Sequence, residues 1–147
     1  ETGGVPFFLG RVGSRKDRVI EREGFMDKLM GFVGRLLYAL PFLGFGIENL
    51  MDAQGKTGIV PPYIPGGIFW IYFTGVAMIL AALALITGKQ GREACLGLAV
   101  MLLIFIVTIH LPHLANPQLK AMGLIQLYKD TSLMGAALVL AGTFKKQ

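Results

Sequence analysis

The sequence predicts an all-α integral membrane protein, an up-down four-helix bundle with both termini in the cytoplasm. Composition is the first observation behind this fold class. Of the 147 residues, 54% are hydrophobic and only 16% are charged, whereas soluble domains carry about 25% charged residues. The second observation is that the charges gather between apolar stretches, which come close to the roughly 20 residues that a helix needs to cross a bilayer.

Four stretches are candidate membrane-spanning helices, at residues 31–51, 68–87, 95–111 and 122–144. The second and third contain no charged residue. The first includes Arg35 and Glu48, and the fourth reaches full length only if its helix begins near Met122. The segments "GKTGIVPPYIPGG", "GKQGRE" and "PHLANPQ" separate the stretches and hold the Pro, Gly and charged residues that typically interrupt helices.

Small residues predict where these helices approach one another, because small side chains let helix backbones come close. They occur in the first and fourth stretches, as Gly44, Gly46, Gly135, Ala136, Ala137, Ala141 and Gly142. Gly88, directly after the second stretch, is expected to close that span.

The distribution of Lys and Arg predicts the orientation in the membrane, because positively charged loops favour the cytoplasmic side. Most of these residues fall in the arm at residues 1–30, in the turn at 88–94 and in the tail at 145–147. Both termini are therefore expected in the cytoplasm. The opposite side holds fewer basic residues, namely Lys56, Lys120 and Lys129.

The arm at residues 1–30 is predicted to be a separate basic region before the membrane domain at 31–147. Its apolar part precedes its basic part, which is the reverse of the order in a signal peptide. Val19, Ile20 and Met26 roughly follow helical spacing. Two interpretations remain open: an interfacial helix at about residues 17–30, or a solvated basic tether.

Ionisable residues are expected to gather at the outer end of the bundle. Because successive spans run in opposite directions, Glu48, His110, Lys129 and Asp130 should lie at similar depth. These four residues are the candidate ligand-binding or proton-binding cluster, since histidine titrates near neutrality and acids within membranes usually have partners. Plain interfacial hydration of helix ends is the alternative interpretation.

Within this cluster, Glu48 carries the largest desolvation problem, because an isolated carboxylate in hydrocarbon is costly. We therefore predict that Glu48 contacts His110 or Lys129. His113, which lies beyond Pro112, is predicted to face water or lipid headgroups.

Several other activities are not expected from this sequence. The chain has a single cysteine, Cys95, which excludes an internal disulfide and a CxxC motif. Pro112 interrupts the spacing of His110 and His113, so no metal site is predicted. The basic residues flank apolar runs, which disfavours nucleic-acid binding. Walker, GxSxG and HExxH motifs are absent from the sequence, so no catalytic residue is assigned.

Four segments of the chain resemble the DoxX family of small bacterial four-helix membrane proteins, over about residues 32–143. They are "GRLLYALPFLGFGIENL", "PYIPGGIFWIYFTGVAMILAALALITGK", "IFIVTIHLP" and "LYKDTSLMGAALVLAG". The resemblance implies a helical bundle in the bacterial inner (cytoplasmic) membrane. Members often have a histidine followed by an aromatic residue in the first span, where this chain has Asn49 and Leu50.

The resemblance also implies a redox-linked role, because some relatives belong to quinone-linked sulfur or thiol oxidation systems and others are membrane partners of oxidoreductases. The main expectation is an accessory or scaffold subunit of a larger inner-membrane complex, not catalytic on its own. Its partners would be the lipid bilayer and other membrane subunits. No cofactor is expected for this main role. One alternative is a redox subunit that binds quinone as a cofactor at the outer polar cluster. A small transporter is a third.

Overall fold

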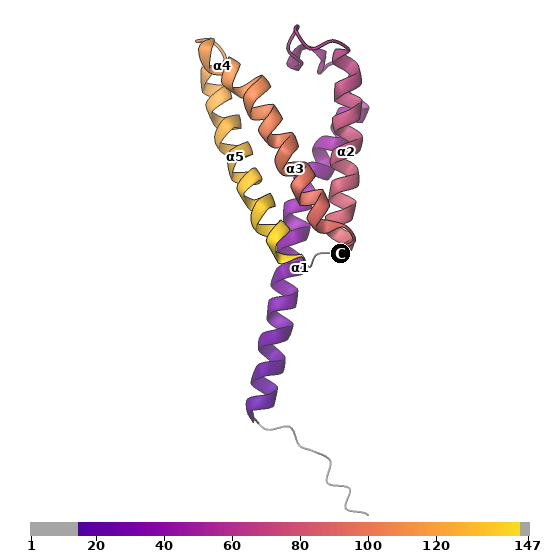
Figure 1. Cartoon of the computed structure of the whole chain (residues 1–147), viewed down its shortest axis with the longest axis vertical. Helices are drawn as coiled ribbons and strands as arrows, with labels where there is room; N and C mark the ends of the chain where they lie inside the picture. The colour runs from indigo at the N-terminus through magenta and orange to yellow at the C-terminus, as the bar shows by residue number, and fades with distance from the viewer. Residues whose placement is uncertain (1–14, 145–147) are drawn as a thin grey trace, which may run out of the picture. The chain divides into compact units, whose positions relative to one another are not determined.

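The computed structural model describes residues 15–144, which are built of helices and connecting turns (Figure 1). The long helices are α1 (Arg15–Met51), α2 (Gly67–Thr87), α3 (Gly91–Phe105) and α5 (Lys120–Thr143), and η1 (Thr57–Ile59) is a short 3-10 turn. A π-helical turn, η2 (Ile106–His110), and α4 (Leu111–Ala115) continue α3 without a break, so that one helix runs from Gly91 to Ala115. Residues 1–14 of the predicted arm and the basic tail at 145–147 lie outside the described residues.

The contacts of the chain divide it into two units, with the boundary between Val33 and Gly34. In the first unit, residues 15–33 are helical, and large apolar side chains such as Ile20, Phe25 and Met30 are exposed. A helix therefore covers the described part of the predicted arm. Its placement at the membrane surface stays a prediction.

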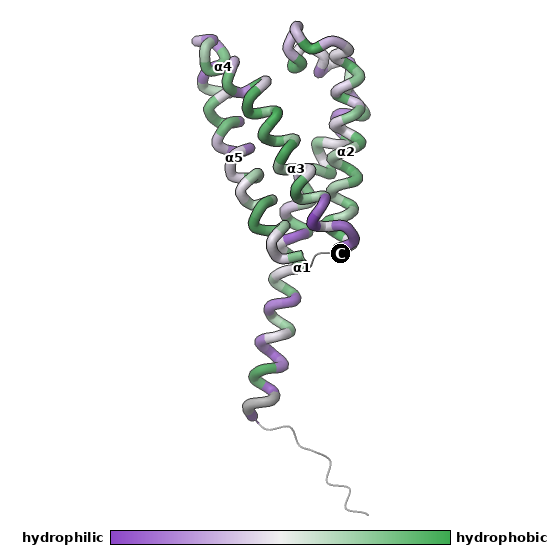
Figure 2. Tube along the Cα trace, in the orientation of Figure 1, coloured by the Kyte–Doolittle hydropathy of each residue, from purple (hydrophilic) through white to green (hydrophobic). Residues whose placement is uncertain are grey.

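Three helices of the described chain are long and apolar enough to cross a membrane: Arg18–Met51, Gly67–Thr87 and Gly91–Ala115. Figure 2 shows α2 and α3 as hydrophobic along most of their length. These features confirm an all-helical chain with helices able to span a bilayer. The third is longer than predicted, since it begins at Gly91 rather than Cys95 and continues through Pro112.

The fourth predicted stretch is also helical. Helix α5 covers Lys120–Thr143, close to the predicted 122–144, but it is not among the three apolar helices. Lys129 and Asp130 near its middle lower its hydropathy. That α5 crosses the membrane therefore stays a prediction.

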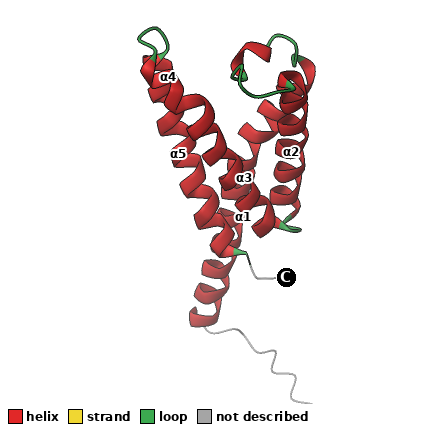
Figure 3. Cartoon of the chain, turned by 45° about the horizontal axis from the view of Figure 1, so that its top comes forward, coloured by secondary structure: helices red, strands yellow, loops and turns green. Residues whose placement is uncertain are grey.

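The apolar core of the second unit joins all four long helices. Ala39, Ala82, Leu85, Cys95 and Ala137 are completely buried in it. Helices α3 and α5 lie side by side (Figures 1 and 3), and Tyr38 Oη of α1 donates a hydrogen bond to the backbone oxygen of Leu133 in α5 at 2.9 Å.

Small residues allow close contact at some of the predicted positions. Ala137 and Ala141 are buried in the core, as expected, whereas a Cβ atom added to Gly135 or Gly142 would meet nothing within 4 Å. The prediction for α5 is therefore right for these two alanines and wrong for both glycines.

The crossing of α1 and α2 depends on a pair of glycines. A Cβ atom on Gly46 would lie 2.8 Å from the backbone oxygen of Gly75, and one on Gly75 would lie 3.1 Å from the backbone oxygen of Gly46. A side chain at either position would push the two backbones apart. Gly44 has nothing within 4 Å of its Cβ position, so only Gly46 of the predicted pair makes this contact.

One end of the second unit is closed by the turn between α2 and α3. Gly88 ends α2 as predicted, with a left-handed φ of 73° that glycine adopts without strain. The Arg35 guanidinium lies 5.6 Å from the centre of the Phe144 ring, and Gly91 leaves room for that ring. Towards the opposite end, the pair α3 and α5 diverges from α2 (Figures 1 and 3).

Candidate functional site

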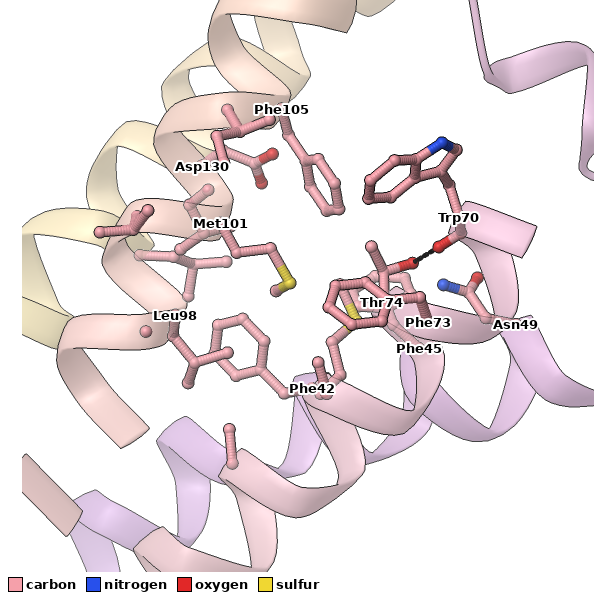
Figure 4. Close-up of a pocket in the computed structure, with 18 of the residues that line it drawn as sticks. Phe42, Phe45, Asn49, Trp70, Phe73, Thr74, Leu98, Met101, Phe105 and Asp130 are labelled. Carbon is pink, nitrogen blue, oxygen red and sulfur yellow. Dashed lines mark hydrogen bonds between the residues drawn. The ribbon is translucent and has the colours of Figure 1, made fainter. Parts of the chain in front are cut away.

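A cavity of about 1040 Å³ lies where the helices diverge (Figure 4). It is bounded by α1 from Pro41 onward, the loop at residues 56–64, α2, α3 and α5. This volume is at the upper end of the usual range for small-molecule sites. Its walls are mainly apolar and aromatic, with Phe42, Phe45, Trp70, Phe73, Met78, Leu98, Met101 and Phe105 among the lining residues.

The α2 wall presents an aromatic cluster held in place by hydrogen bonds. The ring centres of Trp70 and Phe73 are 5.9 Å apart, edge to face. Trp70 Nε1 donates to the Pro65 backbone oxygen at 2.9 Å. Thr74 Oγ1 donates to the Trp70 backbone oxygen at 2.8 Å (Figure 4). A fixed aromatic wall of this kind favours a planar ring as ligand.

The cavity opens sideways between α2 and α3. Phe73 and Leu80 on α2, and Val100 and Ile104 on α3, line the cavity and are also exposed at the surface. An opening edged by large apolar side chains suits an apolar ligand or the apolar tail of one.

A buried pair of ionisable side chains is among the polar groups that line the cavity. His110 Nε2 lies 2.7 Å from Asp130 Oδ2, and the two side chains are only 9% and 5% exposed. Lys129 Nζ lies 3.3 Å from the other carboxylate oxygen, Oδ1, and 5.1 Å from the centre of the Phe45 ring. Three of the four predicted cluster residues are therefore linked, and a buried carboxylate here has the partners that it needs.

The position of His110 follows from Pro112. Proline has no N–H to donate to the Thr108 backbone oxygen, and its ring crowds that carbonyl group. The helix widens instead into a π turn, in which the Leu111 N–H bonds to the Ile106 oxygen. Such turns are frequent at functional sites, and in this one Ile106 and His110 are both buried.

The carbonyl group freed by Pro112 has another partner. Tyr63 Oη, from the loop before α2, donates a hydrogen bond of 2.8 Å to the Thr108 backbone oxygen. This bond ties the loop that lines the cavity to the helix that carries His110.

Glu48 has a different partner from the predicted one. Its Oε2 lies 3.2 Å from Lys56 Nζ, and the same ammonium group donates to Asn49 Oδ1 at 3.1 Å. The Glu48 side chain is 59% exposed at the protein surface, and the Lys56 ammonium group already serves as its cation. The predicted ion pair with His110 or Lys129 is therefore wrong, although Glu48 lines the same cavity as both.

The second histidine lies apart from this site. His113 is half-buried and outside the cavity lining, and its Cβ lies 3.0 Å from where a side chain on Gly123 would begin. Its Cβ packs against α5, and the side chain remains partly exposed. That His113 faces water or lipid headgroups stays a prediction. Across residues 15–144, no group of three or more His, Cys, Asp and Glu side chains could hold a metal ion.

Sequence reasoning missed the cavity and its aromatic wall. The available signal was the spacing of Phe69, Trp70 and Phe73 on one helix, but this spacing equally fits side chains that face lipid. Asn49 and Lys56 were likewise missed as cavity residues.

The DoxX family model matches residues 31–111, which is more than half of the chain. The matched region contains Glu48 and His110 and ends before α5, so it is shorter than the resemblance over 32–143. No curated protein and no solved structure matches the chain.

Proposed function

This chain belongs to the DoxX family, and on that premise we propose that it is a four-span subunit of a redox-linked complex in the bacterial inner membrane. We propose further that it binds a quinone-type ring. The observation that carries this function is the cavity, which combines aromatic walls, an apolar sideways opening and a buried His–Asp pair. Both termini would be cytoplasmic, with α5 as the fourth span of an up-down bundle.

The charges on α5 are compatible with a membrane position. Asp130 pairs with His110 and Lys129, and Lys129 also lies over the Phe45 ring. Ionisable residues within membrane proteins typically face the bundle interior and pair with one another. The residues that lower the hydropathy of α5 thus have partners within the protein.

The cavity residues fit a quinone. Trp70 and Phe73 would hold the ring, the His110–Asp130 pair would lie at the polar end of the site, and an apolar tail would leave between α2 and α3. A bound quinone supplies two-electron, two-proton redox chemistry. Since the chain has one cysteine, it cannot supply these electrons from an internal dithiol. A partner subunit would therefore supply them, which makes this protein an accessory subunit.

Ring binding can be tested with the only tryptophan of the chain, because Trp70 lines the cavity. We expect duroquinone to quench the fluorescence of the full chain in lipid nanodiscs with a saturating curve. Ala77→Phe, which fills the cavity, should weaken binding at least tenfold. Val76→Phe, on the neighbouring outward position, should not. Quenching that is linear with concentration and equal in all three proteins would reject the proposal.

Orientation can be tested by cysteine labelling in a Cys95→Ala background. Gln54, in the turn after α1, and Gln90, in the turn after α2, are both exposed. Gln54→Cys should react with a membrane-impermeant maleimide on intact cells, and Gln90→Cys should react only after lysis. The reverse pattern would invert the proposed topology.

The subunit role predicts a partner with a redox centre. When the full chain is purified in mild detergent, a partner subunit that carries haem or flavin should copurify and be detected by its absorbance. If the chain purifies without a partner and still binds quinone at full affinity, the subunit role is rejected and only quinone binding remains.

A further inference from the structure

One polar atom of the buried pair has no partner. His110 Nδ1 is shielded from solvent and makes no hydrogen bond, while Nε2 of the same ring bonds to Asp130. The His110 side chain is more than nine-tenths buried and lines the cavity. Buried polar atoms are nearly always hydrogen-bonded, so the unpaired Nδ1 of this cavity-lining side chain points to a partner that the described residues do not supply.

The surrounding charges indicate which kind of group is missing. The Asp130 carboxylate already has a cation, because Lys129 Nζ lies 3.3 Å from Oδ1. A protonated His110 would leave a net positive charge in an apolar cavity, which is costly. A neutral imidazole that carries its proton on Nε2 donates to Asp130 Oδ2 and leaves a lone pair on Nδ1.

We propose that Nδ1 accepts a hydrogen bond from a hydroxyl group of the ring, so that the cavity binds a hydroquinone more tightly than the corresponding quinone. This inference rests on the proposed function and specifies its ligand. A hydroquinone has O–H groups to donate, whereas a quinone presents only acceptor oxygens to the lone pair. Because Nδ1 is shielded from solvent, the surrounding side chains would have to move for the hydroxyl to reach it.

Asp130 has a positioning role in this arrangement. Its carboxylate can only accept, and it therefore fixes the proton on Nε2 and the lone pair on Nδ1. In Asp130→Asn, Lys129 Nζ would hold the amide oxygen at the Oδ1 position, so that the amide N–H₂ group donates to Nε2 and the imidazole proton moves to Nδ1. The preference for hydroxylated rings would then reverse.

The test compares binding of duroquinol, duroquinone and the dimethyl ether of duroquinol to the full chain in nanodiscs without oxygen. Saturation is followed through Trp70 fluorescence. We expect duroquinol to bind about tenfold more tightly than the other two, since a buried acceptor left unpaired lowers affinity by roughly this factor or more.

Three variants separate the role of Nδ1 from that of the fold. His110→Gln keeps an amide donor near the Nε2 position and has no acceptor near Nδ1, so the tenfold preference should disappear. Asp130→Asn should bind duroquinone more tightly than duroquinol. His113→Gln, outside the cavity lining, should retain the wild-type preference.

Equal binding of duroquinol and its dimethyl ether to the wild-type protein would overturn the inference and leave the proposed function standing. An unchanged preference in His110→Gln or Asp130→Asn would do the same. If one of these variants does not fold, the wild-type comparison of quinol and ether decides. Absence of saturable binding for every compound would instead overturn the proposed function itself.

Discussion

The two halves of the membrane domain are both apolar, yet only one is closed. The closed half surrounds Leu85, Cys95 and Ala141, and the open half surrounds the cavity at Trp70 and His110. In the closed half, small side chains let the helices meet through completely buried contacts. In the open half, large aromatic rings line the space between α2 and α3, and the buried ion pair joins η2 to α5. Apolar composition therefore does not determine whether a core closes, because the sizes of the facing side chains also matter.

The largest expected effect comes from the same substitution in each half of α2. Ala82 is completely buried in the closed half, and Ala77 lines the cavity. Ala82→Phe should lower stability by about 3 kcal/mol or more, because the added ring has no space. Ala77→Phe should change it by less than about 1 kcal/mol. Thermal unfolding in detergent measures both, and equal losses would show that the halves are packed alike.

The buried ion pair should give the next largest difference. His110→Leu removes the partner of Asp130 Oδ2 and should cost about 3 kcal/mol, since it leaves a buried carboxylate short of a donor. His113→Leu, at a half-buried position outside the cavity, should cost much less. Denaturant titration of both variants provides the comparison. Similar midpoints would mean that the pair contributes little to the open half.

A smaller effect is expected where α1 crosses α2. Gly46→Ala places a methyl group near the Gly75 backbone and should cost about 1–3 kcal/mol through displacement of the helices. Gly44→Ala meets nothing and should be neutral or slightly stabilising, because alanine favours the helix. Loss of stability in both variants would assign the effect to α1 itself rather than to the crossing.

The smallest effect concerns one tyrosine hydroxyl in each half. Tyr38→Phe removes the buried bond to Leu133 and should cost about 0.6 kcal/mol, the usual value for hydrogen bonds between membrane helices. Tyr63→Phe removes the exposed bond to Thr108 and should leave the melting temperature unchanged. It should instead speed proteolysis of the loop at residues 56–64. A loop cut at the wild-type rate would show that this bond does not restrain it.

The closed half and the open half also differ in how far the sequence predicts them. Hydropathy located α2 to within one residue, because an uncharged stretch of that length has few other structures available. The same criterion ended the third helix at Leu111 instead of Ala115, since it takes polar residues and proline as helix ends. Because the π turn provides backbone hydrogen bonds around Pro112, the helix continues past the proline. Whether such a turn forms depends on packing in three dimensions, which hydropathy does not describe.

The candidate site was predictable only in part. The topology of alternating spans brought His110 and Asp130 to one depth, and the structure pairs them. The sequence does not show that Lys56, in the loop after α1, pairs with Glu48 in place of a residue from another helix. The cavity could not be predicted from the sequence either, because it arises from the angle between helices rather than from any single residue.

Pro112 prevents a regular α-helix and thereby places His110 in the site. The widened turn keeps Ile106 and His110, four residues apart, on one buried face. Replacing Pro112 with alanine would restore an N–H able to bond to the Thr108 oxygen, and the segment could relax into an ordinary α-helix. His110 would then rotate away from Asp130, and Tyr63 would face a competitor for its acceptor. A change that makes this helix regular would therefore misalign the histidine, and the buried Asp130 carboxylate would lose a partner.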